Sequence, residues 1–130
     1  MKAIEHIPAI PSDGVVIRPE GGVVRIFFDI ARIEDGISGD DEKMPEDLCT
    51  CINIDVAVPA SYGSVVAAVV SDRFSSDDVQ ALVANYTASL GDDDLPPGKQ
   101  EEYQSEWMGY QEWRKKAKEI AQIVVNRLTV

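Results

Sequence analysis

The chain has 130 residues, of which 45% are apolar and 27% are charged. This length and balance predict a single domain, 1–130, that buries a core without disulfides or metal, and they exclude a chain disordered throughout. The formal net charge of −11 argues against a nucleic-acid partner, because phosphate binding needs a basic surface. The sequence contains neither a long apolar run nor a signal peptide pattern, so we expect a cytoplasmic protein with no membrane partner.

Alternating apolar residues in the first half of the chain predict three antiparallel strands. Residues 15–18 and 23–33 flank the turn-rich sequence PEGG, which is typical of a β-hairpin. Residues 48–58 alternate in the same way and predict a third strand. The expected sheet is therefore a small three-stranded β-meander.

The period of two also assigns the faces of these strands. The predicted core face carries Val24, Ile26, Phe28, Ile30, Ile52, Ile54 and Val56. The opposite face carries Phe27, Asp29, Cys49 and Cys51. Phe27 and the two cysteines give that outer face an apolar character.

Three segments are predicted to lie outside regular helices and strands. Residues 1–12 contain two prolines and are expected to be loosely tethered. Residues 34–47 and 92–98 combine acids with Gly and Pro, which predicts mobile acidic loops.

The second half of the chain predicts helices. Residues 62–74 keep a helical spacing, although their β-branched content leaves a buried strand as the alternative. Residues 75–90 form a complete amphipathic pattern, in which Ser75 is the N-cap and Asp78 completes a capping box. Residues 101–128 predict a long final helix, with Gly109 as a point where it kinks or divides.

Strands followed by helices predict an α+β domain, in which about three helices pack on one face of the sheet. On this arrangement the apolar face of residues 75–90 contacts the sheet. Leu82 and Tyr86 are then expected to be buried against it.

The residues offer little for catalysis. His6 is the only histidine, and it lies in the segment expected to be loosely tethered. No nucleophile elbow, phosphate-binding loop or dinucleotide-binding motif is present, and the acidic runs lack the ligand spacing of a calcium-binding loop. We therefore expect no enzyme activity, no catalytic residues and no cofactor.

Cys49 and Cys51 are the sharpest local feature, because strand geometry places both thiols on one face. They would supply half of a zinc site, but the chain has no second cysteine pair. The preferred interpretation is that they are small apolar residues, covered with Phe27 by another segment or by a partner chain. We expect self-association, as a dimer, through this face or through an edge strand.

Arg114 falls within the apolar stripe of the final helix, between Tyr110 and Ala117. Its stem then lies over the aromatic residues, or its guanidinium pairs with an acid of the sheet. A functional anion site is the alternative. We include Arg114 with Phe27, Cys49 and Cys51 among the candidate interaction residues.

Several short stretches resemble a family. The quoted matches are Tyr62-Gly63, the run from Val69 to Asp77, Val79-Gln80-Ala81, Asn85-Tyr86, the run from Tyr110 to Arg114, and Ala117-Lys118. They look like small uncharacterised proteins from prophages of Bacteroides-type gut bacteria, whose genes lie in tail or tail-fibre regions. In that group Arg-Tyr-Pro is more frequent than Arg73-Phe74-Ser75, and Asn-Asn-Tyr-Leu is more frequent than the sequence from Ala84 to Thr87. The resemblance implies a virion component or an assembly factor with phage proteins as partners.

Three hypotheses about function follow. The preferred one is a non-enzymatic phage structural or assembly protein, found in the host cytoplasm or in the virion, which acts through protein contacts. The second is a cytosolic binding or regulatory module, and the third is an enzyme of an unrecognised type. A binding module should show a pocket with convergent polar groups, and an assembly protein should show an apolar surface or a free sheet edge.

Overall fold

The computed structural model describes residues 1–33 and 47–129, so most of the predicted loop 34–47 lies outside the described residues. Four strands form one antiparallel sheet: β1 (Lys2–His6), β2 (Val16–Glu20), β3 (Val23–Arg32) and β4 (Leu48–Ala57). Three helices follow: α1 (Tyr62–Arg73), α2 (Ser76–Gly91) and α3 (Lys99–Leu128). The predicted α+β class is confirmed.

The described sheet has four strands, in the order β1-β4-β3-β2, where the sequence predicted three. The additional strand is β1, which comes from the segment expected to be loosely tethered and pairs with β4 from Lys2 opposite Ile52 to His6 opposite Leu48. The predicted hairpin is present, since β2 and β3 are joined at Gly21 and Gly22. Gly21 has φ of 61°, a conformation that glycine adopts readily in such a turn.

A β-bulge interrupts β3. The pairing between β3 and β4 shifts between Phe28 and Ala31, and Asp29 has φ of 51°. Aspartate is one of the few residue types that enter this left-handed region. Because the bulge reverses the alternation, Ile30 packs with Phe27 on the opposite face of the sheet. The prediction that Ile30 belongs to the face of Phe28 is therefore wrong.

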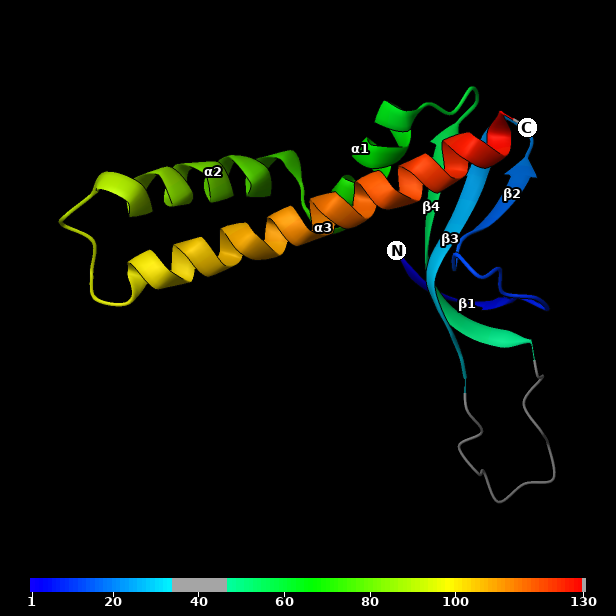
Figure 1. Cartoon of the computed structure of the whole chain (residues 1–130), viewed down its shortest axis with the longest axis horizontal. Coiled ribbons are helices and arrows are strands. Elements are labelled where there is room, and N and C mark those ends of the chain that lie inside the picture. Colours follow the sequence, from blue (N-terminus) through cyan, green and yellow to red (C-terminus); the bar gives the residue numbers. More distant parts are fainter. Residues whose placement is uncertain (34–46, 130) are drawn as a thin grey trace, which may run out of the picture.

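The main core lies between one face of the sheet and two helical segments, α1 and the second half of α3 (Figure 1). The predicted inward residues Val24, Ile26 and Phe28 are at most 5% exposed, and α1 contributes the fully buried Val65 and Val69. The sheet-facing part of α3 contributes Trp113, Ala117, Ile120, Ala121 and Val124. The burial of these apolar side chains is the main stabilising term of the fold.

The helix signals in the sequence have their structural counterparts. Ser75 caps α2: its hydroxyl accepts a hydrogen bond from the amide of Asp78 at 3.0 Å, and the Asp78 carboxylate accepts one from the amide of Ser75 at 2.9 Å. Residues 62–73 form a helix, which settles the alternative of a buried strand. The final helix runs without a break through Gly109.

α2 and the first part of α3 form a helical hairpin that projects away from the sheet (Figure 1). We call residues 75–112 the arm. Tyr86 stacks on Trp107, with ring centroids 4.8 Å apart and an interplanar angle of 13°, so α2 packs on α3. Leu82 and Tyr86 are half-buried in this hairpin. The expectation that they are buried against the sheet is wrong.

Candidate interaction surfaces

The outer face of the sheet holds a second, smaller core. Phe27, Cys49 and Cys51 are 1%, 0% and 3% exposed. They are covered by the chain that follows β1, in which Ile7 is fully buried and Ile10 packs on the same cluster. This confirms the preferred interpretation of Cys49 and Cys51 as small apolar residues covered by another segment. The choice of Phe27, Cys49 and Cys51 as accessible interaction residues is therefore wrong. Because they are buried, these residues are also not accessible for the dimer contact that was expected through this face.

The surroundings of Cys51 favour its neutral thiol. Burial raises the pKa of the Cys51 thiol, and the negative charge of Glu5 raises it further. One terminal guanidinium nitrogen of Arg32 lies 3.3 Å from the Cys49 sulfur, and the other donates to the carbonyl oxygen of Pro8 at 2.9 Å. Among the residues that the structure describes, no three His, Cys, Asp or Glu side chains gather as a metal site would require.

One cationic residue of α3 forms an ion pair with the sheet, and it is Lys116 in place of Arg114, for which such a pair was one of two alternatives. Arg114 is half-buried, and its side chain forms no hydrogen bond or ion pair with another described residue. Lys116, two residues later, pairs with the Asp29 carboxylate on β3. An ion pair between α3 and an acid of the sheet is therefore present, although Lys116 makes it and Arg114 does not. The bulge, which turns Asp29 toward α3, could not be predicted from the alternation.

His6 lies at the end of β1 with its side chain 64% exposed. Its ring nitrogen Nδ1 is 3.1 Å from the Asp47 carboxylate. This hydrogen bond is the main reason why the pKa of Asp47 is lowered. His6 therefore belongs to a surface pair with Asp47 at the sheet edge.

A groove of about 500 Å³ lies where α1, α2 and α3 meet. It is lined by Arg73, Phe74, Asp78, Leu82, Asn85 and Tyr110, among others. The Arg73 guanidinium lies 5.1 Å from the ring centroid of Trp113 and 5.6 Å from that of Phe74, so its charge is close to two aromatic rings. The sequence reasoning missed Arg73, because nothing in the local pattern brings it next to Trp113.

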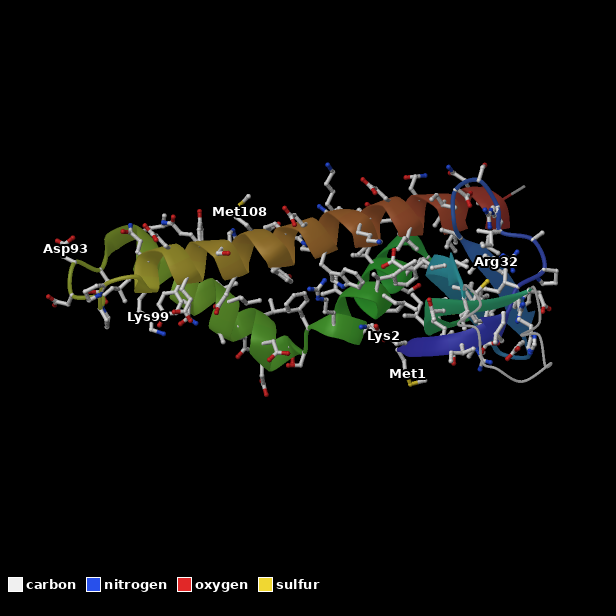
Figure 2. The ribbon with its side chains drawn as sticks, turned by 90° about the horizontal axis from the view of Figure 1, so that it is seen from below. Met1, Lys2, Arg32, Asp93, Lys99 and Met108 are labelled. Carbon is white, nitrogen blue, oxygen red and sulfur yellow. The ribbon has the colours of Figure 1, made fainter. Side chains whose placement is uncertain are left out.

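The arm carries the most exposed apolar residues of the helices. Val83 on α2 is 45% exposed, Leu90 is 64% exposed, and Met108 on α3 is 59% exposed. Figure 2 shows Met108 on the side of α3 that is turned away from α2. The arm also has nine acidic side chains and one basic side chain, a net charge of −8 in a chain of −11. Its surface is therefore apolar at a few positions and acidic around them.

Comparison of the chain with protein-family models, with curated proteins and with solved structures finds no match. Within the described residues, none of the helices has the length and apolar character needed to cross a membrane.

Proposed function

We propose that this chain is a non-enzymatic interaction protein, and that it serves a phage or prophage as a structural or assembly factor of the tail region. The observation that carries the proposal is the arm, a helical hairpin that extends beyond the sheet with Val83, Leu90 and Met108 exposed. Exposed apolar residues on an element that projects from the domain are accessible to another protein. The resemblance to proteins of Bacteroides-type prophages supplies the phage context.

Contacts between its two helices stabilise the arm, although it projects away from the sheet. Tyr86, Trp107 and Tyr110 form a continuous aromatic row between its helices, and the Gln100 side chain donates to the carbonyl oxygen of Ser89 at 3.0 Å. A rigid projecting element loses little conformational entropy on binding. The acidic charge of the arm selects a partner with a basic surface, because complementary charge steers association.

The test uses a host strain that carries the prophage, with the gene deleted and restored as variants. Val83→Asp together with Met108→Asp places charges on the exposed apolar positions without touching the core. Gln122→Asp is the matched control, since Gln122 is exposed on α3 outside the arm. We expect the double variant to lower the yield of tailed particles seen by electron microscopy and the control to leave it unchanged. A normal yield from the double variant would contradict the proposal.

The second candidate is a cytosolic binding module, which the groove beside Arg73 favours. Arg73, Asn85 and Tyr110, which all carry polar groups, line this groove of about 500 Å³. Convergent polar groups in a concavity are the usual mark of a small-molecule site. A fragment screen by NMR that shifts the Asn85 side-chain amide, with no effect of the arm variants on particle yield, would favour this candidate.

A further inference from the structure

The outer edge of β1 offers unpaired backbone groups to an added strand. Met1 and Asn53 exchange two backbone hydrogen bonds of 2.9 Å, and the amide of Ile7 donates to the carbonyl oxygen of Asp47 at 2.7 Å. In an antiparallel pair the bonded residues alternate, so the residues between them direct their N–H and C=O groups to the other side. Those residues are Lys2, Ile4 and His6.

The two edges of the sheet are protected unequally. On the β2 edge Pro19 lacks an amide donor, and Arg127 donates to the carbonyl oxygen of Val15 at the start of the strand. On the β1 edge the carbonyl oxygen of His6 accepts from Arg18 at 2.6 Å. The backbone groups of Lys2 and Ile4 form no outward hydrogen bond with any residue in the described part of the chain. On β2, Ile17 is the residue whose outward N–H and C=O groups have no partner among the described residues, whereas on β1 both Lys2 and Ile4 are in this state. The β1 edge is therefore the more open of the two.

A hollow of about 700 Å³ adjoins this open edge. Its lining includes Lys2, Ile4, Asp29, Thr50 and Ile52, and Ile4 is 63% exposed. A second hollow of about 450 Å³ shares Lys2, Asp29 and Ile52 with the first and reaches Asp72, Arg73 and Trp113. Figure 2 shows Met1 and Lys2 at the end of β1 that lies next to the helices. The open edge and the two hollows form one continuous surface.

The charges of this surface are opposite in sign to those of the whole chain. Asp29 is paired with Lys116, and Asp72 is paired with the amino group of Met1. Lys2 and Arg73 form no ion pair with a carboxylate of the described residues. Two cations are therefore left to face the hollows, in a chain whose net charge is −11. A ligand that complements the surface carries negative charge.

We propose that the β1 edge binds an extended acidic segment of a partner protein, which pairs with Lys2 and Ile4 as a fifth strand. Strand addition supplies main-chain hydrogen bonds, and alternate side chains supply specificity. An apolar side chain opposite Ile4 covers the exposed isoleucine, and a carboxylate two residues away on the same face meets Lys2. This surface is separate from the arm, so the inference does not depend on the proposed function.

A second copy of this chain fits the edge less well. A strand of five residues buries far less than the roughly 1,200–2,000 Å² of a stable protein interface. Each copy would also bring a net charge of −11 to the contact. Pairing between two copies is therefore an outcome that the experiment must distinguish.

The experiment is an NMR titration of the full isotope-labelled chain with a blocked synthetic peptide, Ser-Thr-Val-Thr-Glu-Thr-Ser. We expect amide shifts centred on residues 2–6, and new protection of the Ile4 amide from hydrogen exchange. Lys2→Glu should weaken binding about fivefold, the range of one or two exposed ion pairs, and a peptide with Lys in place of Glu should regain it. Tight binding of the original peptide to Lys2→Glu would contradict the charge assignment.

Ile4→Pro tests the backbone contact. It removes the outward N–H of Ile4 while the inward bonds of Ala3 and Glu5 to β4 remain, and Ile4→Thr is the matched control that keeps the donor. We expect Ile4→Pro to abolish peptide binding, with Ala3 and Glu5 still protected from exchange. If Ile4→Pro detaches β1 from β4, the Lys2→Glu variant and the peptide with Lys in place of Glu decide the test.

Failure of the peptide to shift any β1 amide at millimolar concentration would overturn the proposal. Protection of Ile4 that rises with protein concentration, without peptide, would assign the edge to a second copy.

Discussion

The indole N–H of Trp113 on α3 donates a hydrogen bond of 2.9 Å to the carbonyl oxygen of Val69 on α1. Both residues are buried, and the Trp113 ring also contacts Phe28 on β3, with ring centroids 6.0 Å apart. One side chain therefore joins α1, α3 and the sheet at the point where the arm leaves the core. A buried indole without this acceptor would lose a hydrogen bond that water could not replace.

Replacing Trp113 separates its hydrogen bond from its packing. Trp113→Phe keeps an aromatic ring and should lower the free energy of unfolding by about 1 kcal/mol, whereas Trp113→Ala should lower it by about 3–5 kcal/mol. Urea denaturation followed by circular dichroism gives both values. Trp107→Phe is the control: it keeps the stack on Tyr86 and should change stability by less than about 0.5 kcal/mol. Equal losses for the two Phe variants would mean that the bond to Val69 contributes nothing.

The arm should open independently of the sheet, because its helices pack on each other. Tyr86→Ala removes the ring that stacks on Trp107. We expect amides of α2 to exchange with solvent at least about tenfold faster, since an aromatic pair and its burial contribute more than about 1.4 kcal/mol. Amides of β3 and β4 should keep their rates in hydrogen-exchange mass spectrometry. Thr87→Ala, at an exposed neighbouring position, should leave α2 unchanged, and equal acceleration in the sheet would show that arm and sheet open together.

Local signals were read correctly from the sequence wherever the signal and its partner lie close together in the chain. The capping box of Ser75 and Asp78 spans four residues, and the β2–β3 hairpin turns at two glycines. The spacing of residues 62–73 was sufficient to favour a helix over a strand. In each case neighbouring residues determine the backbone conformation, so no tertiary information is needed.

Long-range packing could not be read in the same way. The apolar face of α2 is genuine, but periodicity states only that a face is covered, and here α3 covers it in place of the sheet. Ile7 and Ile10 cover Phe27 although Pro8 separates them and β1 carries no strong strand signal. The bulge lies between Phe28 and Ala31, and it reverses the faces of the side chains that follow it in β3.

The surfaces that now carry the proposals were missed for the same reason. Lys2 and Arg73 are distant in the chain, and they face connected hollows only because β1 pairs with β4 beside the end of α1. The candidates chosen from sequence, Phe27, Cys49 and Cys51, were conspicuous as apolar residues on an outer face. Their apolar character is explained by the second core, in which Ile7 covers them.

The capping box should make the stability of α2 depend on pH. The hydrogen bond that the Asp78 carboxylate accepts from the backbone of Ser75 lowers the Asp78 pKa below its ordinary value of 3.8. A carboxyl group whose pKa is lower in the folded state stabilises it above the unfolded pKa, and this contribution is lost as the pH falls through the folded pKa. Asp78→Asn can still accept the bond but does not titrate. We expect the helical signal of wild type to fall further between pH 5 and pH 2 than that of Asp78→Asn. Parallel curves would show that Asp78 has no part in the acid transition.

The two thiols give the last prediction, because burial raises the pKa of Cys51 and the neutral form is then favoured. A raised thiol pKa stabilises the folded state below the unfolded pKa, and this contribution is lost as the pH rises through the folded one. At pH 7 native thiols should react with a disulfide reagent at least about a hundredfold more slowly than in urea, which corresponds to an opening free energy of about 3 kcal/mol. Absorbance at the released thiol measures both rates. Rapid reaction of the native protein would mean that the covering segment around Ile7 opens freely.

Metal analysis of the purified protein tests the opposite outcome. Stoichiometric zinc that is lost when Cys49 and Cys51 are both replaced by serine would show that the thiols bind a metal and that the second core is a ligand site.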